Sequence, residues 1–460
     1  MAEHAEVLIL GAGGGGYPAA FLLAGAGRRV VLVDPIGNLG GDCLAEGCVP
    51  SKAVRESALV LAQVRRAGHL AVHIEGAAAR WPEVLARKDA VQRTRYAQHA
   101  AELAGSQVQL LKGQARIVGE RLIEVDEEAQ GTRRFSFEHL VVATGSAPQR
   151  LPVPGAERAV TSHDLFRLGA DLPFPARPLI IGGGYIGVEC ASMLEHLGAQ
   201  PVILELTDQL LPGFDPDLAG FLHRSLSERV HIELGAEVLE IDGTPGALQV
   251  RFRQNGQVRV AVGDAVIMAA GRTSVLPEGM ERLGLPTAGA IPVDSGLRCA
   301  NPAVWAPGDV NGRSMLFHSA VRQSLVVAHN ILAGGGPGDR MDFGSVPFTV
   351  FTEPELASVG LSEAAARGSH AEVAVARYDY AVDARAQILD ATSGFIKLVF
   401  DGHTARLLGG QIAGVDAAQL IAPLALAISQ GIGARGLAEV AFPHPMISEG
   451  INKAARQVLL

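Results

Sequence analysis

The chain has 460 residues, of which 48% are hydrophobic and 19% are charged, and its net charge at pH 7 is −9. This length and composition predict a folded α/β protein of about three domains and exclude a disordered chain. The acidic balance argues against nonspecific nucleic-acid binding, which requires a basic surface.

The N-terminus and the apolar segments indicate neither a targeting signal nor a membrane anchor. The start, MAEHAEVLILGAGGGG, passes from a short polar stretch into an apolar one and lacks the basic region and cleavage site of a signal peptide. No stretch offers about 18 uninterrupted apolar residues. The segment AAQLIAPLALAIS at 417–429 comes nearest, but Gln419 and Pro423 interrupt it, which favours a buried helix. We therefore expect a cytoplasmic protein that does not bind membranes.

A nucleotide-binding pattern begins the chain. Gly11, Gly13 and Gly16 follow an apolar strand with G-x-G-x-x-G spacing, a helical stretch follows at 17–26, and the strand RVVLVD ends at Asp34. The glycines let the backbone approach a pyrophosphate at the helix N-terminus, and the acid accepts a hydrogen bond from a ribose. The strand, helix, strand and terminal acid together predict a dinucleotide site.

Two cysteines follow in GGDCLAEGCVPSK, at positions 43 and 48. In a regular α-helix, Cα atoms five residues apart lie roughly 8–9 Å from each other, whereas a disulfide tolerates up to about 7 Å. Cys43 and Cys48 can therefore pair only if the backbone between them leaves regular helix, and Gly47 permits that distortion. The nearby fingerprint favours thiol–disulfide chemistry over a structural disulfide or a metal site, because zinc would need four ligands. Lys52 is either a solvated helix residue or a cation that stabilises a thiolate or a reduced flavin.

The other two cysteines do not indicate a disulfide framework. Such a framework would be unusual in a long cytosolic chain. Cys190 and Cys299 stand alone in apolar surroundings. Because a free cysteine usually behaves as a small hydrophobic residue, we expect both to be inert and buried.

The nucleotide-binding pattern recurs in PLIIGGGYIGVE, where Gly182, Gly184 and Gly187 follow a strand, and PVILE ends a second strand at Glu205. Glu205 follows Gly182 by 23 positions, the same separation as in the first copy. The repetition predicts two dinucleotides. A carboxylate at this position binds a free ribose hydroxyl and repels a 2′-phosphate, and the next ten residues contain no Lys or Arg, so NAD is favoured over NADP.

Changes in composition suggest the domain boundaries. SAPQRLPVPG at 146–155 is typical of a linker, and AGGGPG at 333–338 marks a break before the strand-like segments SVPFTVF and GFIKLVF. Residues 270 to 340 carry no fingerprint and could complete either nucleotide unit. We assign residues 1–148 and 270–341 to an FAD-binding domain, 149–269 to an NAD-binding domain and 342–460 to a dimerisation domain.

Motifs along nearly the whole chain resemble the pyridine nucleotide-disulfide oxidoreductases, the family of dihydrolipoamide dehydrogenase, glutathione reductase and mercuric reductase. They are the first fingerprint, GGDCLAEGCVPSK, VVATGSAP at 141–148, GGGYIGVE at 182–189, AAGRT at 269–273, WAPGDV at 305–310 and FPHPMISE at 442–449. The resemblance implies an α/β fold with two Rossmann-like domains, binding FAD and NAD, and an α+β C-terminal domain that forms a homodimer.

The resemblance also implies roles for the redox residues. Cys48 matches the cysteine beside the flavin, which forms a charge-transfer thiolate, and Cys43 matches the cysteine that exchanges with substrate. Lys52 matches the lysine near flavin N5, and Glu189 matches the carboxylate that pairs with it. No metal is expected.

His444 and Glu449 match the family's His–Glu dyad, which acts in the active site of the other subunit. Without the surrounding PHPxxSE match, a histidine between two prolines would more often be structural. The chemistry fits, because an imidazole of pKa near 6.5 can take the proton of a thiol of pKa near 8.5. A carboxylate on the other ring nitrogen would fix the tautomer.

By the same resemblance, Asp309 holds the ribityl hydroxyls of the flavin and Asp34 its ribose. The remaining positions expected to contact FAD are Gly11, Gly13, Gly16, Gly41, Asp42, Ala115, Thr144, Gly145 and Phe317. Those expected to contact NAD are Gly182, Gly184, Tyr185, Ile186, Gly187, Glu205 and Val238. Gly271 and Arg272, in the AAGRT motif, are also expected to contact a cofactor.

Comparison within the family favours dihydrolipoamide dehydrogenase. Mercuric reductase uses a further cysteine pair near its C-terminus, whereas the last cysteine here is Cys299. Glutathione reductase generally uses NADPH, carries arginines in its nucleotide loop and favours PKK where this chain has PSK. Dihydrolipoamide dehydrogenase is NAD-linked.

Several residues depart from the dihydrolipoamide dehydrogenase pattern. Tyr185 resembles the tyrosine that gates the nicotinamide pocket of glutathione reductase, and Phe317 stands where a small residue is usual near the flavin. Phe442 and Pro443 replace a common HA, and Met446 replaces a common threonine. These departures concern substrate shape and leave the redox chemistry intact.

We therefore expect an enzyme that oxidises protein-bound dihydrolipoyl groups and reduces NAD through a Cys43–Cys48 disulfide and FAD. One alternative is a related NAD(P)H-dependent reductase of another small disulfide such as glutathione. The other is a noncatalytic FAD/NAD redox sensor, which would need no acid–base dyad. The sequence does not name the lipoyl carrier or the direction of the reaction.

Overall fold

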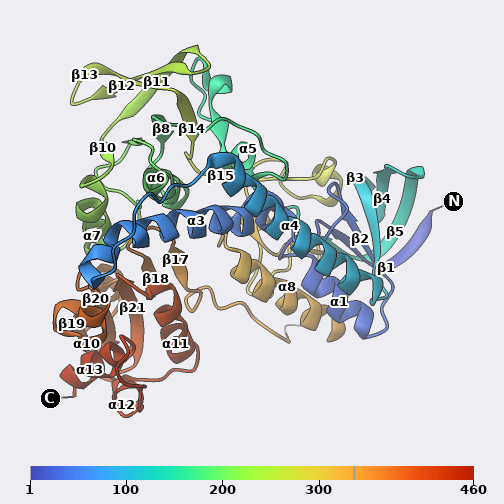
Figure 1. The fold of residues 1–460 in the computed structure, drawn as a ribbon. Coiled ribbons are helices and arrows are strands. Elements are labelled where there is room, and N and C mark those ends of the chain that lie inside the picture. The colour runs from blue at the N-terminus through green and yellow to red at the C-terminus, as the bar shows by residue number, and fades with distance from the viewer. Residues whose placement is uncertain (1, 335–337, 460) are drawn as a thin grey trace.

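The first nucleotide-binding pattern lies at the centre of a six-stranded sheet. The computed structural model of the chain describes residues 2–334 and 338–459 (Figure 1). The strands of this sheet are β1 (Glu3–Leu10), β2 (Val30–Asp34), β3 (Gln109–Gly119), β4 (Leu122–Glu127), β5 (Gly131–Val142) and β16 (Val304–Trp305). Strands β3, β2, β1, β5 and β16 pair in parallel, while β4 joins β3 and β5 antiparallel.

The continuous apolar run in β1 is explained by burial on both faces of this sheet. Val7 and Ile9 pack into the cluster formed with helices α1 (Tyr17–Gly25) and α8 (Phe317–Leu332). Leu8 and Leu10 point into the opposite cluster, between the sheet and residues 280–310. The register, with Val7 opposite Val30, places the carboxyl ends of β1 and β2 at one edge.

The second nucleotide-binding pattern forms a five-stranded parallel sheet of the same kind. Its strands, in spatial order, are β10 (His231–Leu234), β9 (Val202–Glu205), β8 (Pro178–Ile181), β14 (Ala265–Met268) and β7 (Val160–Thr161). An antiparallel meander of β11 (Glu237–Thr244), β12 (Ala247–Gln254) and β13 (Gln257–Gly263) is attached to it, and β15 (Arg272–Ser274) pairs with β6 (Ser146–Pro148).

The C-terminal region forms an antiparallel sheet with helices packed on it. Its strands are β17 (Phe348–Val350), β18 (Leu356–Gly360), β21 (Leu407–Ala413), β20 (Phe395–Asp401) and β19 (Val373–Asp379). Its helices are α9 (Glu363–Ser369), α10 (Ala384–Ile388), α11 (Ala417–Ser429), α12 (Ala434–Ala438) and α13 (Glu449–Gln457). Helix α11 buries Leu420, Ile421 and Leu424, which confirms the predicted buried helix despite Pro423.

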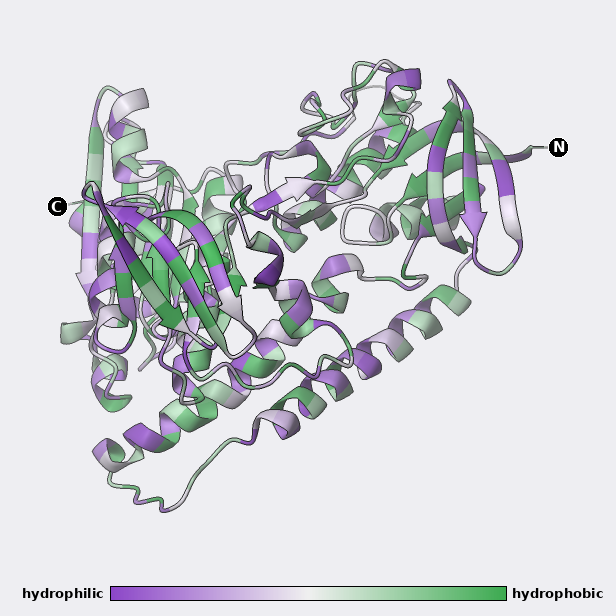
Figure 2. Cartoon of the chain, turned by 90° about the horizontal axis from the view of Figure 1, so that it is seen from above, coloured by the Kyte–Doolittle hydropathy of each residue, from purple (hydrophilic) through white to green (hydrophobic). Residues whose placement is uncertain are grey.

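The remaining helices connect the sheets, and the longest lie side by side (Figure 2). They are α2 (Gly41–Ala45), α3 (Cys48–Arg66), α4 (Trp81–Ala104), α5 (Ser162–Phe166), α6 (Tyr185–His196) and α7 (Pro216–Ser227). Hydrophilic and hydrophobic bands alternate along α3 and α4 in Figure 2, because each helix has one face packed against the protein and one in solvent. Helix α3 begins at Cys48 and so connects the first sheet to the redox residues.

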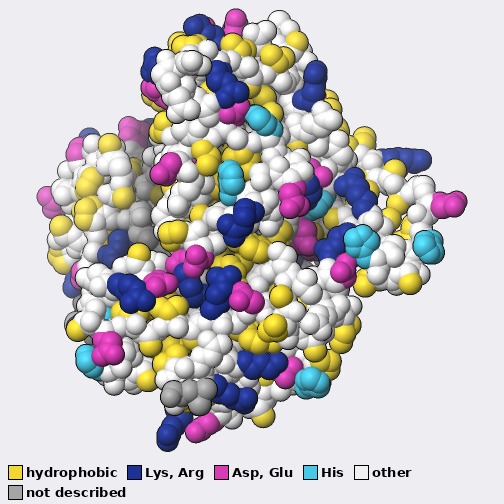
Figure 3. Space-filling view, turned by 90° about the vertical axis from the view of Figure 1, so that its left-hand side faces the viewer, with side chains coloured by type: hydrophobic (Ala, Val, Ile, Leu, Met, Phe, Trp, Pro, Cys, Tyr) yellow, Lys and Arg dark blue, Asp and Glu magenta, His cyan; other side chains and the backbone are white. Residues whose placement is uncertain are grey.

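The fold confirms the predicted α/β class, with one mainly parallel sheet, one parallel sheet and a C-terminal α+β region. The exact domain boundaries remain a prediction, although β16 places part of the segment 270–341 in the first sheet. The predicted break at 333–338 lies partly outside the described residues. None of the helices in the described ranges combines the length and apolarity that a membrane crossing needs. On the face seen in Figure 3, basic and acidic side chains are interspersed.

Candidate active site

A cavity of about 930 Å³ opens where strands of the first sheet end. The residues that follow β1, β2, β5 and β16 line it, together with the start of α3 and part of α6. In parallel α/β sheets, the crevice outside the carboxyl ends of the strands is where nucleotides bind. The cavity extends from Asp34 to Cys48 and lies within the volume range of ligand and cofactor sites.

The first fingerprint forms a cradle with one open glycine. A Cβ atom at Gly11 would lie 2.3 Å from the Ala143 carbonyl oxygen, and one at Gly16 would lie 1.9 Å from that of Gly11, so both glycines are required by packing. A Cβ atom at Gly13 would meet no atom closer than 3.7 Å. The open space at Gly13 faces the cavity, as it must if a pyrophosphate approaches the backbone there. These residues fit FAD.

Asp34 closes this cradle from the end of β2. Its Oδ2 accepts a hydrogen bond from the Ala12 N–H at 2.8 Å, and its Oδ1 accepts one from the Ile36 N–H at 2.8 Å. Burial raises the pKa of the Asp34 carboxyl, and these backbone donors oppose that effect. The Gly37 N–H also donates to Oδ1, at 3.3 Å, so Oδ2 is the oxygen that keeps a lone pair for a ribose hydroxyl.

The redox turn, defined here as residues 41–48, leaves regular helix as the cysteine spacing requires. Helix α2 ends at Ala45, Gly47 has φ −119° and ψ −111°, and α3 begins at Cys48. Cys43 and Cys48 are free thiols in this structure and both line the cavity. A hydrogen bond from Cys43 lowers the pKa of Cys48 against the effect of burial, and the Lys52 ammonium lowers it further. The same hydrogen bond and burial raise the pKa of Cys43. The pair therefore favours a thiolate on Cys48.

Lys52 and Glu189 meet beside Cys48, as the family resemblance implies. Lys52 Nζ lies 2.7 Å from Glu189 Oε2, and the other carboxylate oxygen accepts a hydrogen bond from the Phe351 N–H at 2.9 Å. The Phe351 ring lies under the ammonium, with its centroid 4.5 Å from Nζ. Although burial alone would lower the pKa of Lys52, its pairing with Glu189 raises it. Phe351 was not predicted from the sequence. It lies 299 positions after Lys52 in the chain, and only folding brings the two residues into contact.

A second polar chain connects the redox turn to Asp309. Asp309 Oδ2 accepts a hydrogen bond from Ser146 Oγ at 2.6 Å, and Ser146 Oγ accepts one from Arg272 Nε at 2.7 Å. Arg272 Nη2 also donates to Asp42 Oδ2 at 2.8 Å. Ser146 belongs to the VVATGSAP motif but was not among the predicted site residues. This series of hydrogen bonds places Asp309 and Asp42 on opposite sides of the Arg272 guanidinium.

The structure brings most of the predicted FAD and redox residues to this cavity. Those that line it are Gly11, Gly13, Asp34, Gly41, Asp42, Cys43, Cys48, Lys52, Ala115, Thr144, Gly145, Tyr185, Ile186, Glu189, Arg272, Asp309 and Phe317. The predicted residues that do not line it are Gly16, Gly182, Gly184, Gly187, Glu205, Val238, Gly271, His444 and Glu449. The predicted roles of all these residues, lining or not, stay predictions.

The two unusual aromatic residues both belong to the cavity wall. The ring of Phe317 lies against the fingerprint loop, 3.0 Å from the position of a Cβ atom at Gly14. Tyr185 begins α6 and contacts Phe348 edge-on, with ring centroids 5.4 Å apart. Burial raises the pKa of Tyr185 to about 12, so its hydroxyl stays protonated at neutral pH.

The second fingerprint repeats the geometry of the first. A Cβ atom at Gly187 would lie 1.9 Å from the Gly182 carbonyl oxygen, whereas one at Gly184 would meet nothing within 4 Å. Glu205 Oε2 accepts a hydrogen bond from the Gly183 N–H, and Oε1 accepts one from the Thr207 N–H at 2.7 Å. Glu205 is thus oriented as Asp34 is, and the residues fit NAD.

We expect Gly184→Ala and Gly187→Ala to have different effects. Gly184 has φ −70° and ψ 178°, which alanine adopts readily, so this variant should fold normally and lose NADH affinity about tenfold or more by crowding the pyrophosphate. Gly187→Ala would drive a methyl group into backbone, and its unfolding midpoint should fall. Urea unfolding and NADH titration check both; unchanged NADH affinity in a folded Gly184→Ala variant would contradict the assignment.

His444 and Glu449 form the predicted pair, away from the cavity of their own chain. His444 Nδ1 lies 3.0 Å from Glu449 Oε2, and the imidazole is 72% exposed. Burial opposes ionisation of Glu449, but the Met446 backbone amide and His444 lower its pKa. The carboxylate can therefore hold Nδ1–H and leave Nε2 free as a base, in a position open to a second subunit.

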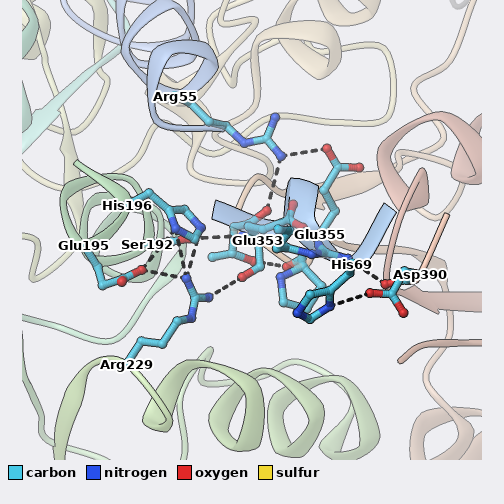
Figure 4. Close-up of polar contacts among 12 residues, drawn as sticks. Arg55, His69, Ser192, Glu195, His196, Arg229, Glu353, Glu355 and Asp390 are labelled. Atoms are coloured by element: carbon cyan, nitrogen blue, oxygen red, sulfur yellow. Dashed lines mark hydrogen bonds and ion pairs between the residues drawn. The ribbon is translucent and has the colours of Figure 1, made fainter. Parts of the chain in front are cut away.

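A junction formed by residues 351–355 ties the C-terminal region to the helices that carry the redox residues (Figure 4). Arg55 of α3 donates to the Phe351 carbonyl from Nε at 2.7 Å and to Glu355 from Nη2 at 2.8 Å. The Glu353 N–H donates to Ser192 of α6 at 3.1 Å. This junction fixes the Phe351 N–H that orients Glu189.

We expect Arg55→Ala to lower the free energy of unfolding by about 2–4 kcal/mol, because it removes the cation from the half-buried Glu355 carboxylate and the donor from two carbonyl groups. Arg80→Ala is the matched control, since the Arg80 side chain is 79% exposed and its ion pair with Glu83 should contribute less than about 1 kcal/mol. Urea titration measures both. Equal effects would show that the junction does not stabilise the chain.

The two isolated cysteines are buried, as predicted. Cys190 is 2% exposed and Cys299 is 7% exposed. Burial raises the pKa of each thiol to about 12. Both thiols stay protonated at neutral pH.

Proteins of known sequence and structure resemble the chain over its full length. A dihydrolipoyl dehydrogenase from Bacillus subtilis is 31% identical over 98% of this chain and 95% of its own. The flavoprotein disulfide reductase RclA from Escherichia coli, solved as a Cu(II) complex, matches with a TM-score of 0.87 at 28% identity and covers both chains fully. LpdA from Mycobacterium tuberculosis matches with a TM-score of 0.88 at 27% identity over 99% of this chain and 100% of its own.

Two family descriptions cover most of the chain. Residues 5–324 match "Pyridine nucleotide-disulphide oxidoreductase", and residues 346–455 match its dimerisation domain, which supports the predicted homodimer. FAD and NAD, the cofactors predicted from the sequence, are those of the family. The fold, the cavity and these matches establish that the chain belongs to the pyridine nucleotide-disulfide oxidoreductase family.

Proposed function

We propose that this oxidoreductase is a dihydrolipoyl dehydrogenase that oxidises protein-bound dihydrolipoyl groups in the cytoplasm and reduces NAD⁺. The full-length likeness to curated dihydrolipoyl dehydrogenases carries the proposal. The Cys43–Cys48 pair, the Lys52–Glu189 ion pair and the absence of basic residues from 206 to 215 are consistent with it.

The proposed reaction begins when His444 of the partner subunit takes a proton from a dihydrolipoyl thiol. The thiolate attacks Cys43 Sγ of the Cys43–Cys48 disulfide, and Cys48 leaves as a thiolate that Lys52 stabilises. The second substrate thiol then attacks the sulfur bonded to Cys43, which closes the lipoyl disulfide and releases Cys43, and Cys43 takes up the proton of that second thiol. FAD, when bound, would accept the electron pair from the dithiol and transfer it to NAD⁺.

The other residues of the site hold the components in place. Glu189 keeps Lys52 charged beside Cys48, and Glu449 would orient His444. Asp34 and the first fingerprint would bind the adenine half of FAD, and Asp309 its ribityl chain. Glu205 would bind the ribose of NAD.

A related reductase of another small disulfide is the second candidate. The likeness to the disulfide reductase RclA and the two aromatic residues in the cavity wall, Tyr185 and Phe317, favour it. A noncatalytic redox sensor is less consistent, because a sensor does not need the His444–Glu449 dyad.

The deciding experiment is anaerobic NADH formation by the purified holoenzyme from dihydrolipoamide and NAD⁺, beside an assay with NADPH and oxidised glutathione. Rapid NADH formation supports the first candidate. Activity only with NADPH and glutathione supports the second. The third outcome is that neither activity is found and that the half-reduced protein shows no long-wavelength thiolate–flavin band. This outcome would favour the noncatalytic sensor.

A further inference from the structure

His163 of α5 lies between two carboxylates that belong to the redox turn. Its Nε2 is 2.7 Å from Asp42 Oδ1, and its Nδ1 is 2.7 Å from Glu46 Oε2. Asp42 directly precedes Cys43, and Glu46 is the residue that follows α2. One imidazole therefore contacts both ends of the short helix that carries Cys43.

Helix α4 fixes the relative position of α5 and α2. Lys88 Nζ, which is fully buried, donates to the Arg167 carbonyl at 2.7 Å and to Gln92 Oε1 at 3.0 Å. Gln92 Nε2 donates to the Leu44 and Ala45 carbonyls at 3.0 Å and 2.8 Å. Because one pair of side chains holds the C-terminal ends of both short helices, the contact of His163 with α2 is built into the fold.

The charges around His163 favour its cationic form. Burial alone would lower the pKa of the imidazole, but Asp42 and Glu46 raise it to about 9. Arg272 of β15 faces Asp42 from the other side, and Tyr96 of α4 faces Glu46 with its own pKa raised by burial. At neutral pH, His163⁺ and Arg272⁺ together balance the charges of Asp42 and Glu46.

This balance matters for the redox pair, because the Asp42 carboxylate raises the pKa of both Cys43 and Cys48. Without the imidazolium, the turn would carry one more uncompensated negative charge. That charge would disfavour thiolate formation at the adjacent cysteines.

We propose that His163 is a positioning residue that clamps the redox turn as a cation and keeps the thiolate form of the Cys43–Cys48 pair accessible at neutral pH. The inference rests on the proposed redox role of those two cysteines. Since folding raises the pKa of His163, its ion pairs stabilise the fold fully below pH 6.5, and their contribution is lost as pH rises through about 9.

The test is the pH dependence of iodoacetamide alkylation of Cys43 and Cys48 in the dithiothreitol-reduced holoenzyme, resolved by peptide mapping. In His163→Gln, the midpoint of alkylation should move to higher pH by about 0.5–1 unit, a loss of about three- to tenfold in rate near neutral pH. His163→Lys keeps the charge and should remain close to wild type. His231→Gln removes a similar histidine–carboxylate pair with Glu233, and should shift nothing.

Each other outcome overturns the inference. An unchanged midpoint in folded His163→Gln would show that the clamp does not act on the thiols, and an equal shift in His163→Lys would show that charge is not its basis. Asp42, Glu46 and His163 also offer ligand atoms within 4.8 Å of one another. A shift produced in wild type by EDTA would therefore assign the effect to a bound metal ion. The alkylation assay uses no lipoyl substrate. Its result therefore does not depend on whether the protein oxidises dihydrolipoyl groups.

Discussion

Replacement of Cys48 by serine is expected to abolish NADH formation from dihydrolipoamide and NAD⁺, by at least about a thousandfold, while FAD remains bound. A serine hydroxyl can neither form the disulfide nor leave as a stabilised anion beside Lys52. The cradle at Gly11, Gly13 and Asp34 does not involve Cys48, so flavin content should be unchanged. The measurement is anaerobic NADH absorbance, with the flavin spectrum recorded on the same sample.

Cys299→Ala is the matched control for this prediction. Cys299 is buried in the core of the first sheet, and it does not line the cavity. Loss of that thiol should leave turnover near wild type. Substantial turnover by an FAD-loaded Cys48→Ser variant would refute the disulfide mechanism, and the chain would then transfer electrons without the redox turn.

The features that the sequence predicted well are those encoded by contiguous residues. Gly16 must lack a side chain because it contacts the Gly11 carbonyl within the same β–α unit, and Gly187 is crowded by the Gly182 carbonyl in the same way. The irregular backbone at Gly47 also follows from local spacing. Such constraints can be read along the chain because their partners are close in sequence.

The features that the sequence did not predict depend on contacts between distant segments. Phe351 orients Glu189 and packs on Lys52, and no local pattern places it there. His163 follows an ordinary strand, and its contacts with Asp42 and Glu46 arise only because Lys88 and Gln92 hold α5 against α2. Charge balance at the redox turn is therefore a property of the packed molecule, whereas the cysteine spacing is a property of the motif.

Replacement of His444 by glutamine is expected to lower dihydrolipoamide turnover by about 10²–10⁴-fold, the usual range for loss of a general base. NADH-dependent reduction of ferricyanide, which needs no thiol deprotonation, should persist. Because His444 is 72% exposed and lies outside the cavity of its own chain, it can act only if a second subunit presents its cavity to it.

Mixed dimers test that arrangement directly. A purified heterodimer of one Cys48→Ser chain and one His444→Gln chain should recover about half of wild-type activity, because one of its two sites combines an intact cysteine pair with an intact imidazole from the other chain. Each homodimer of a single variant should show only the strongly reduced turnover expected of that variant. If His444 instead served its own chain, both sites of the heterodimer would be defective. An inactive heterodimer that is folded and FAD-loaded would therefore place the base within one subunit and require the C-terminal region to move toward the cavity.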